Sequence, residues 1–232
     1  MENKKIIFWG AASQAVVLEE LISYSGSEIL AVFDNNTAAE SPFAGVPIYH
    51  KKAGFEQWYA QHQEEELYFA VAIGGEYGFS RLEMHDYLSS FGLKPFQCVH
   101  PTSFIANNAT IGEGCHILAK SAICARSKLG RSVILNTLAD IDHECTIDDG
   151  AHVSANVIVA GGCTIGSNAF VGIGAAILPR LTIGKNAIIG AGSVITKDVP
   201  DNAVAYGNPA KVHYYRDESG NRVEIEAIPQ QQ

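Results

Sequence analysis

The chain has 232 residues, of which 47% are hydrophobic and 18% charged, and its formal net charge at pH 7 is −9. This composition is typical of an ordinary globular protein with one large or two small domains, and it excludes a disordered or fibrous chain. The negative charge argues against nucleic acid or an anionic membrane as a partner, because neither attracts an acidic surface.

No apolar stretch reaches the ~18 residues of a spanning helix, and the first residues do not resemble a signal peptide. We therefore expect a cytoplasmic protein without membrane insertion. The five cysteines include no C-x-x-C pair, so in that compartment they are expected to be free thiols.

The first hundred residues alternate short apolar runs with amphipathic stretches. Strands are expected at 5–9, 29–33 and 67–73, and helices around 17–22, 55–62 and 81–88. This alternation predicts a small, parallel, Rossmann-like βαβ sheet with right-handed crossovers.

Ligands bind beyond the carboxyl ends of the strands in such a sheet. Three segments are expected at that edge: Gly10–Ala15, Asp34-Asn35 and Gly74-Gly75. The first segment is not G-x-G-x-x-G, so a plain strand-to-helix turn is an equal alternative to a nucleotide loop. Asp34 either accepts hydrogen bonds from a ribose, a base or a sugar amine, or merely closes its strand.

From residue 105 onward an aliphatic residue recurs at every sixth position. The series has sixteen members without a frame shift: Ile105, Ile111, Ile117, Ile123, Leu129, Leu135, Ile141, Ile147, Val153, Val159, Ile165, Val171, Ile177, Ile183, Ile189 and Ile195. A small residue or valine follows each of them after four positions, except for Leu181. A period of six fits neither a helix nor one long strand. It predicts a left-handed parallel β-helix of a little over five triangular coils, each made of three hexapeptides.

Two features of the repeat carry further expectations. Glycine follows the aliphatic residue in six hexapeptides, from Gly112 to Gly190, where we expect turns that need a permissive φ. Cys115, Cys145 and Cys163 fall in the small-residue series, so we interpret them as buried and not as nucleophiles.

A prism filled with aliphatic side chains has no internal cavity, so chemistry has to take place on its outside. His143 lies at an expected corner between Asp142 and Glu144, and Glu144 is placed to polarise its imidazole. We interpret His143 as a titratable base. Gly161 follows it by 18 residues, one coil, so its amide is expected one strand spacing away and suited to an oxyanion. His152 is half a coil from His143 and projects from another part of the triangle.

Several segments together resemble the sugar-acetyltransferase branch of the hexapeptide acyltransferases. This branch includes nucleotide-4-amino-sugar N-acetyltransferases (PglD type) and sialic acid O-acetyltransferases (NeuD type). The resemblance covers nearly the whole chain up to Lys211. It rests on Asn136-Thr137, Ile141-Asp142-His143-Glu144-Cys145, His152-Val153-Ser154, Ala160-Gly161 and Gly207-Asn208-Pro209-Ala210-Lys211.

The resemblance implies roles for individual residues. His143 would be the general base, and Glu144 would raise its basicity. Gly161, His152, Ile173 and Ala191 would contact acetyl-CoA, and the segment 207–211 would cap the coenzyme groove. The nucleotide sugar would be held by the positions Ser13, Gln14, Ala15, Asp34, Asn35, Gly74 and Gly75. The resemblance further implies a homotrimer with active sites between subunits, where His152 of one subunit approaches His143 of another.

One departure concerns the first loop, which in the family usually reads Gly-Ala-x-Gly-His-Gly. This chain has Ser13-Gln14-Ala15 in place of Gly-His-Gly, and glutamine cannot carry a charge near a diphosphate. The choice among UDP, dTDP and GDP, and the need for a nucleotide at all, are therefore open.

The expected domains are a Rossmann-like nucleotide-sugar-binding domain (1–100), the β-helix (101–212) and a tail with a short hairpin (213–232). The expected reaction is transfer of acetyl from acetyl-CoA to the 4-amino group of a nucleotide-linked 4-amino-4,6-dideoxy sugar, for bacterial surface glycan synthesis and without a metal. O-acetylation of a sialic acid or related sugar is one alternative, and a non-catalytic β-helix scaffold is another.

Overall fold

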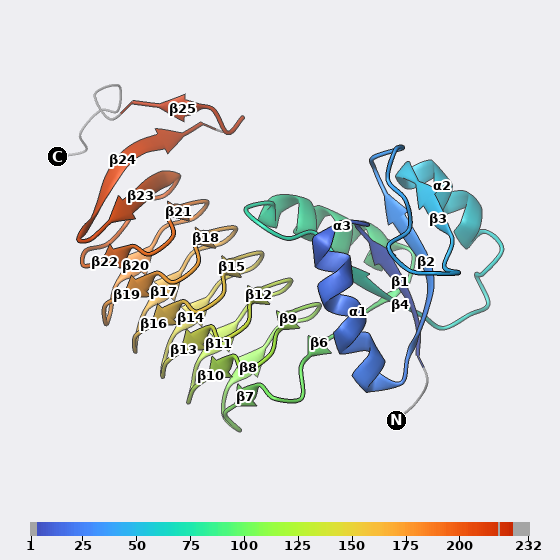
Figure 1. Cartoon of the computed structure of the whole chain (residues 1–232), viewed down its shortest axis with the longest axis horizontal. Coiled ribbons are helices and arrows are strands. Elements are labelled where there is room, and N and C mark those ends of the chain that lie inside the picture. Colours follow the sequence, from blue (N-terminus) through green and yellow to red (C-terminus); the bar gives the residue numbers. More distant parts are fainter. Residues whose placement is uncertain (1–3, 218, 225–232) are drawn as a thin grey trace.

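The computed structural model describes residues 4–217 and 219–224. An N-terminal α/β part lies beside a long β-helix, and a C-terminal hairpin covers the C-terminal end of the β-helix (Figure 1). No helix within these residues is long and apolar enough to cross a bilayer.

The N-terminal part is a five-stranded, all-parallel sheet with the strand order β3-β2-β1-β4-β5. Its strands are β1 (Lys5–Trp9), β2 (Glu28–Asp34), β3 (Ile48–His50), β4 (Leu67–Val71) and β5 (Lys94–Pro95), and its helices are α1 (Ser13–Ser25), α2 (Lys51–Tyr59) and α3 (Gly78–Ser90). Helix α1 packs through Leu18 on one face of the sheet, and α2 and α3 pack through Phe55 and Leu88 on the other. The expected Rossmann-like fold is confirmed.

The boundaries of these elements differ in detail from the sequence prediction. β3 and β5 were not predicted, because three- and two-residue edge strands leave no periodic pattern. β4 ends at Val71, two residues earlier than predicted, and α2 covers 51–59 where a helix over 55–62 was predicted.

The β-helix is confirmed by sixteen two-residue strands in unbroken sequence, each pairing in parallel with the strand one coil away. They are β7 (Phe104–Ile105), β8 (Thr110–Ile111), β9 (His116–Ile117), β10 (Ala122–Ile123), β11 (Lys128–Leu129), β12 (Ile134–Leu135), β13 (Asp140–Ile141), β14 (Thr146–Ile147), β15 (His152–Val153), β16 (Ile158–Val159), β17 (Thr164–Ile165), β18 (Phe170–Val171), β19 (Ala176–Ile177), β20 (Thr182–Ile183), β21 (Ile188–Ile189) and β22 (Val194–Ile195).

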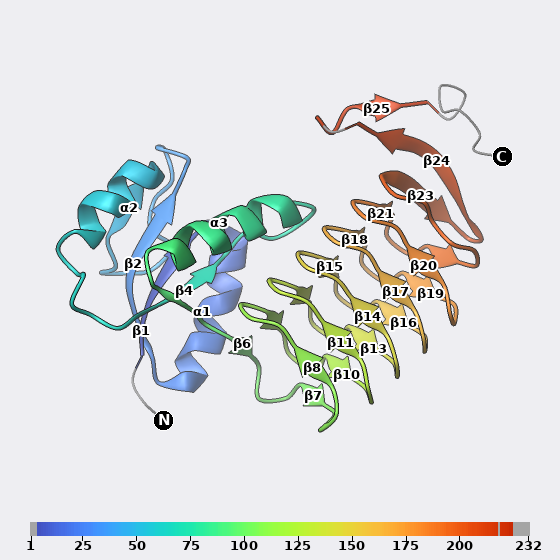
Figure 2. The ribbon, with the colours of Figure 1, turned by 180° about the vertical axis from the view of Figure 1, so that it is seen from behind.

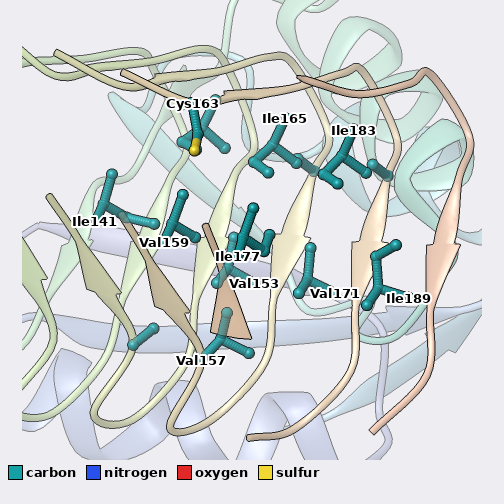
Figure 3. Close-up of a cluster of buried hydrophobic side chains, with 14 of the residues drawn as sticks. Ile141, Val153, Val157, Val159, Cys163, Ile165, Val171, Ile177, Ile183 and Ile189 are labelled. Atoms are coloured by element: carbon teal, nitrogen blue, oxygen red, sulfur yellow. The ribbon is translucent and has the colours of Figure 1, made fainter. Parts of the chain in front are cut away.

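The second residue of each of these strands is the aliphatic residue of the repeat. From Ile117 to Ile195 every one of them is at most 4% exposed. Figure 3 shows Ile141, Val159 and Ile177 on successive coils with their side chains inside the prism. Cys145 and Cys163 are each 1% exposed, as expected for the small-residue series.

The expectation that the glycines after the aliphatic residue occupy turns with positive φ is wrong. Positive φ falls two residues later, for example at Gly114, Glu144 and Asn186. The glycines after the aliphatic residue are needed for a different reason, namely close approach of the neighbouring coil. A Cβ atom on Gly112 would lie 2.5 Å from the backbone of Gly130.

The three sides of the prism differ in what covers them. We name the side formed by β9, β12, β15, β18 and β21 the N-domain face, that formed by β7, β10, β13, β16, β19 and β22 the open face, and that formed by β8, β11, β14, β17 and β20 the threonine face. The N-terminal part lies against the N-domain face in both views of the chain (Figures 1 and 2). β6 (Cys98–Val99) connects the two parts and pairs with β9.

Arg81 of α3 fixes the N-terminal part to the β-helix. Arg81 is 1% exposed, and its guanidinium donates to the carbonyl oxygens of Ser132 and Gly150 in the β-helix and of Ile73 in the loop after β4. Burial lowers the pKa of Arg81 to about 10, so the side chain remains charged at neutral pH. These hydrogen bonds of Arg81 therefore fix the loop 73–75 relative to the prism.

The C-terminal end of the prism continues into β23 (Ala203–Gly207), β24 (Ala210–Arg216) and β25 (Arg222–Val223), which join the sheet of the N-domain face. β24 and β25 pair antiparallel around the turn predicted at 217–222. Arg216 forms an ion pair with Glu76, next to Gly75 of the N-terminal part. Residues 225–232 of the predicted tail lie outside the described residues.

Candidate active site

His143 lies at the corner of the prism between the open face and the threonine face, which we name the His143 corner. The turn is possible because Glu144 adopts a left-handed conformation with φ 59°. The His143 amide donates to Asp142 Oδ1 over 2.7 Å, and its ring Nδ1 lies 3.2 Å from Glu144 Oε2. A carboxylate at Nδ1 favours the tautomer in which Nδ1 carries the proton and Nε2 is free to accept one.

Gly161 occupies the equivalent position one coil later, and the imidazole of His143 packs directly against it. A Cβ atom at position 161 would lie 2.5 Å from His143 Nε2. The His143 amide has the preceding residue, Asp142, as its acceptor. The residue before Gly161 is Ala160, which offers the Gly161 amide no side-chain acceptor. Within residues 4–217 and 219–224 the Gly161 amide donates no hydrogen bond. The residue against which the imidazole packs therefore has a backbone N–H without a partner among the described residues.

Cys145 is two residues from His143 but is not part of this arrangement. Its thiol points into the prism, where it donates to the carbonyl oxygen of Ala160 over 3.3 Å. Burial raises the pKa of the Cys145 thiol to about 11, so it is protonated at neutral pH. A Cys-His nucleophile is excluded on this geometry.

The predicted nucleotide-sugar segments lie together at the carboxyl edge of the N-terminal sheet. Both carboxylate oxygens of Asp34 accept backbone amides over 2.8 Å, from Ala11 and from Asn36. Asp34 therefore holds the first loop to the second, and it can take a ligand only with its remaining lone pairs. Ala12, the N-cap of α1, offers no side-chain oxygen to the first turn, which leaves amides free for an anion.

Gln14 and Gly75 connect this edge to the N-domain face of the prism. Gln14 Nε2 lies 3.4 Å from His116 Nδ1, and His152 Nδ1 lies 3.1 Å from the Gly75 carbonyl oxygen. His116 and His152 are 2% and 6% exposed, and within the described residues the Nε2 atom of each has no hydrogen-bond partner. Burial is the main reason that the pKa of His116 falls to about 3 and that of His152 to about 4. Both rings are therefore neutral.

The residues predicted to contact acetyl-CoA do not converge within one chain. Gly161 is at the His143 corner, whereas Ile173 and Ala191 lie at the corner between the N-domain face and the open face. His152 is on the N-domain face itself, the side of the triangle opposite the His143 corner. A single chain thus separates His143 from the nucleotide-sugar segments.

Two residues of this region were not singled out by the sequence. Arg81 was predicted only as part of a helix, and His116 only as a residue of the repeat. Neither lies in a recognisable motif, and their partners in the other part of the chain are 51 to 102 residues away. Among the described residues no three His, Cys, Asp or Glu side chains form a group that could hold a metal ion.

Comparison with known proteins identifies the family to which the chain belongs. Residues 162–197 match the family model described as bacterial transferase hexapeptide (six repeats). The acetyltransferase domain of PglB from Neisseria gonorrhoeae, solved in complex with acetyl coenzyme A, is 28% identical with a TM-score of 0.79, over 91% of this chain and 100% of that one.

PerB from Caulobacter crescentus, solved in complex with CoA and GDP-perosamine, is 30% identical with a TM-score of 0.81 and covers 90% of this chain and 96% of that one. A mutant perosamine N-acetyltransferase from the same organism is 29% identical with a TM-score of 0.82 over the same shares. The chain belongs to the hexapeptide-repeat sugar acetyltransferases. The family expected from the sequence is confirmed, and the protein is an acetyl-CoA-dependent sugar acetyltransferase.

Proposed function

We propose that the protein transfers the acetyl group of acetyl-CoA to the 4-amino group of a nucleotide-linked 4-amino-4,6-dideoxy sugar, for bacterial surface glycan synthesis. The observation that carries the proposal is the arrangement of His143, whose Nδ1 lies 3.2 Å from Glu144 and whose ring packs against Gly161. The relatives solved with CoA and GDP-perosamine support the sugar class.

In the proposed reaction His143 Nε2 accepts the proton of the sugar amine as the amine nitrogen attacks the thioester carbonyl carbon. A C–N bond forms and the C–S bond breaks. The free amide of Gly161 donates to the carbonyl oxygen while that oxygen carries negative charge. The proton held on His143 then passes to the departing thiolate, so His143 ends the cycle neutral.

The nucleotide sugar is proposed to bind at the carboxyl edge of the N-terminal sheet. Ser13, Gln14 and Ala15 form the first turn of α1; the Ala15 amide donates to the Ala12 carbonyl oxygen, and the amides of Ser13 and Gln14 face the diphosphate in this proposal. Asp34 and Asn35 lie on one side of this turn and Gly74-Gly75 on the other. An exposed aromatic ring, Tyr77, packs next to Gly75 and offers a stacking surface to a base or a sugar.

The proposed assembly is a homotrimer with each active site between two subunits. The open face and its two corners expose Leu138, Ile158, Ile173 and Leu178, each 45% to 57% accessible in the single chain. Such a row of aliphatic side chains on one side of a prism favours contact with another subunit. A contact there would bring the His143 corner of one subunit toward Ile173, Ala191 and His152 of another, as acetyl-CoA binding at these positions requires.

We keep the cytoplasm as the proposed compartment, because the five cysteines are free. We likewise keep the division into domains at 1–100, 101–212 and 213–232 as a proposal. Family membership favours the enzyme over the non-catalytic scaffold.

The experiment is an acetyl-transfer screen that measures thiol release from acetyl-CoA. Acceptors are UDP-, dTDP- and GDP-linked 4-amino-4,6-dideoxyhexoses and free sialic acid. Turnover with one nucleotide-linked amine is expected, and His143→Ala should lower kcat by ~10²–10⁴ with a modest change in KM. Acetylation of sialic acid alone would establish the O-acetyltransferase alternative. Near-normal turnover by His143→Ala would refute the assignment of the base.

A further inference from the structure

Arg126 lies at the His143 corner, one coil before Glu144. The two residues occupy equivalent positions of the turn, with left-handed φ angles of 62° and 59°. The Glu144 amide donates to the carbonyl oxygen of Ala125 over 2.9 Å, and the Arg126 amide donates to Asn108 Oδ1 over 3.1 Å. The backbone at both positions is therefore fixed, and the two side chains leave the prism in the same direction.

The carboxylate of Glu144 bridges Arg126 and His143. Its Oε1 lies 3.3 Å from Arg126 Nη1, and its Oε2 lies 3.2 Å from His143 Nδ1. Each oxygen thus has one partner. The hydrogen bond to His143 and, after it, the one to Arg126 lower the pKa of Glu144, which keeps the carboxylate ionised.

The Glu144 side chain is 53% exposed, so packing alone does not fix its rotamer. A glutamate held only by His143 would exchange that contact for water and turn away from the ring. The positive charge of Arg126 on the other oxygen provides a second anchor and restricts this motion. Within the described residues the Arg126 guanidinium forms no hydrogen bond with His143.

We infer that Arg126 is a positioning residue for acetyl transfer, which holds Glu144 in the orientation that keeps Nδ1 of His143 occupied and leaves Nε2 as the proton acceptor. The inference rests on the proposed function, because it assumes that His143 is the general base and that Glu144 supports it. The contact is exposed in the single chain, and exposed ion pairs are weak. Its contribution is therefore a few-fold effect on kcat.

The test is a double-mutant cycle on the full-length enzyme with Arg126→Gln, Glu144→Gln and the double variant. Arg126→Gln should lower kcat about three- to tenfold with KM within about twofold, and in the Glu144→Gln background it should have no further effect. Arg126→Lys, which keeps the charge, should recover most of the rate. Lys51→Gln is the matched control, because Lys51 is an exposed cation with the same φ of 62° at the start of α2.

The outcomes separate the inference from the proposed function. Three outcomes would overturn the role of Arg126 without affecting the roles of His143 and Glu144. They are an equal loss of kcat in both Glu144 backgrounds, a change confined to KM, and a similar loss of kcat in Lys51→Gln. Wild-type kcat in Glu144→Gln would show that Glu144 does not support His143, and it would overturn the role of Arg126 as well.

Discussion

Replacement of Gly161 by alanine tests the contact between His143 and the next coil. An added Cβ would lie 2.5 Å from Nε2 and 2.6 Å from Cε1 of His143, so the imidazole has to move by roughly 1 Å to restore a normal contact. The backbone tolerates the change, because Ala125 and Pro179 carry side chains at the equivalent corner positions two coils before and one coil after. The strain is therefore confined to the ring.

The expected cost falls on catalysis and not on stability. The His143 side chain is 56% exposed and free to turn outward, so the unfolding midpoint should change little. A 1 Å displacement of a reacting group can cost about 10²-fold in rate, and the movement also lengthens the contact with Glu144. We expect kcat of Gly161→Ala to fall by ~10² with KM changed much less.

Thiol release from acetyl-CoA and thermal unfolding measure the two quantities on the same preparation. The double variant Gly161→Ala/His143→Ala is expected to be no slower than His143→Ala alone, because both changes act on the same ring. Gly54→Ala in α2, where a Cβ would make an ordinary contact of 3.4 Å, is the control for the substitution. Wild-type kcat in Gly161→Ala would refute the idea that the base works from its position against this glycine.

Three further predictions concern the interfaces of the chain. Arg81→Met leaves buried carbonyl oxygens without a donor and should lower the free energy of unfolding by about 3 kcal/mol in urea titrations. The control is Arg131→Gln, which breaks only partly exposed ion pairs. It should lower the free energy of unfolding by under ~1 kcal/mol. The folded-state pKa values of about 3 for His116 and about 4 for His152 lie below the ~6.5 of an unfolded chain. The unfolded chain then binds more protons, so stability falls as the pH drops from ~6.5 toward ~4, by up to ~1.4 kcal/mol per pH unit for each ring. Urea titrations at about pH 7 and about pH 5 check this slope, and His116→Gln should flatten it; an equal slope in that variant would contradict the assignment. Ile158→Asp puts a charge on the open face and should yield folded monomers without activity in light scattering and thiol release, and an unchanged trimer would contradict the proposed interface.

The sequence by itself determined the β-helix and the neighbours within it. A contact between residues 18 apart follows from the repeat, because each coil has the same length and the coils pair in register. The repeat therefore predicts that His143 and Gly161 lie side by side and that Cys145 is buried, and the structure confirms both. The βαβ alternation was also predictable from local sequence, since each strand and helix has its own hydrophobic period. Only the short edge strands β3 and β5 of that sheet were not predicted.

The tertiary structure decided how the two parts meet and which side of the prism remains free. Arg81 contacts Gly150, 69 residues away, and His152 contacts Gly75, 77 residues away; no repeat relates such pairs, and their geometry follows from how α3 packs on the N-domain face. The same packing determines that His143 lies opposite the nucleotide-sugar segments within one chain. The repeat places Arg126 one coil before Glu144, but it does not predict that the Arg126 guanidinium turns toward the Glu144 carboxylate, because both side chains are exposed at the corner.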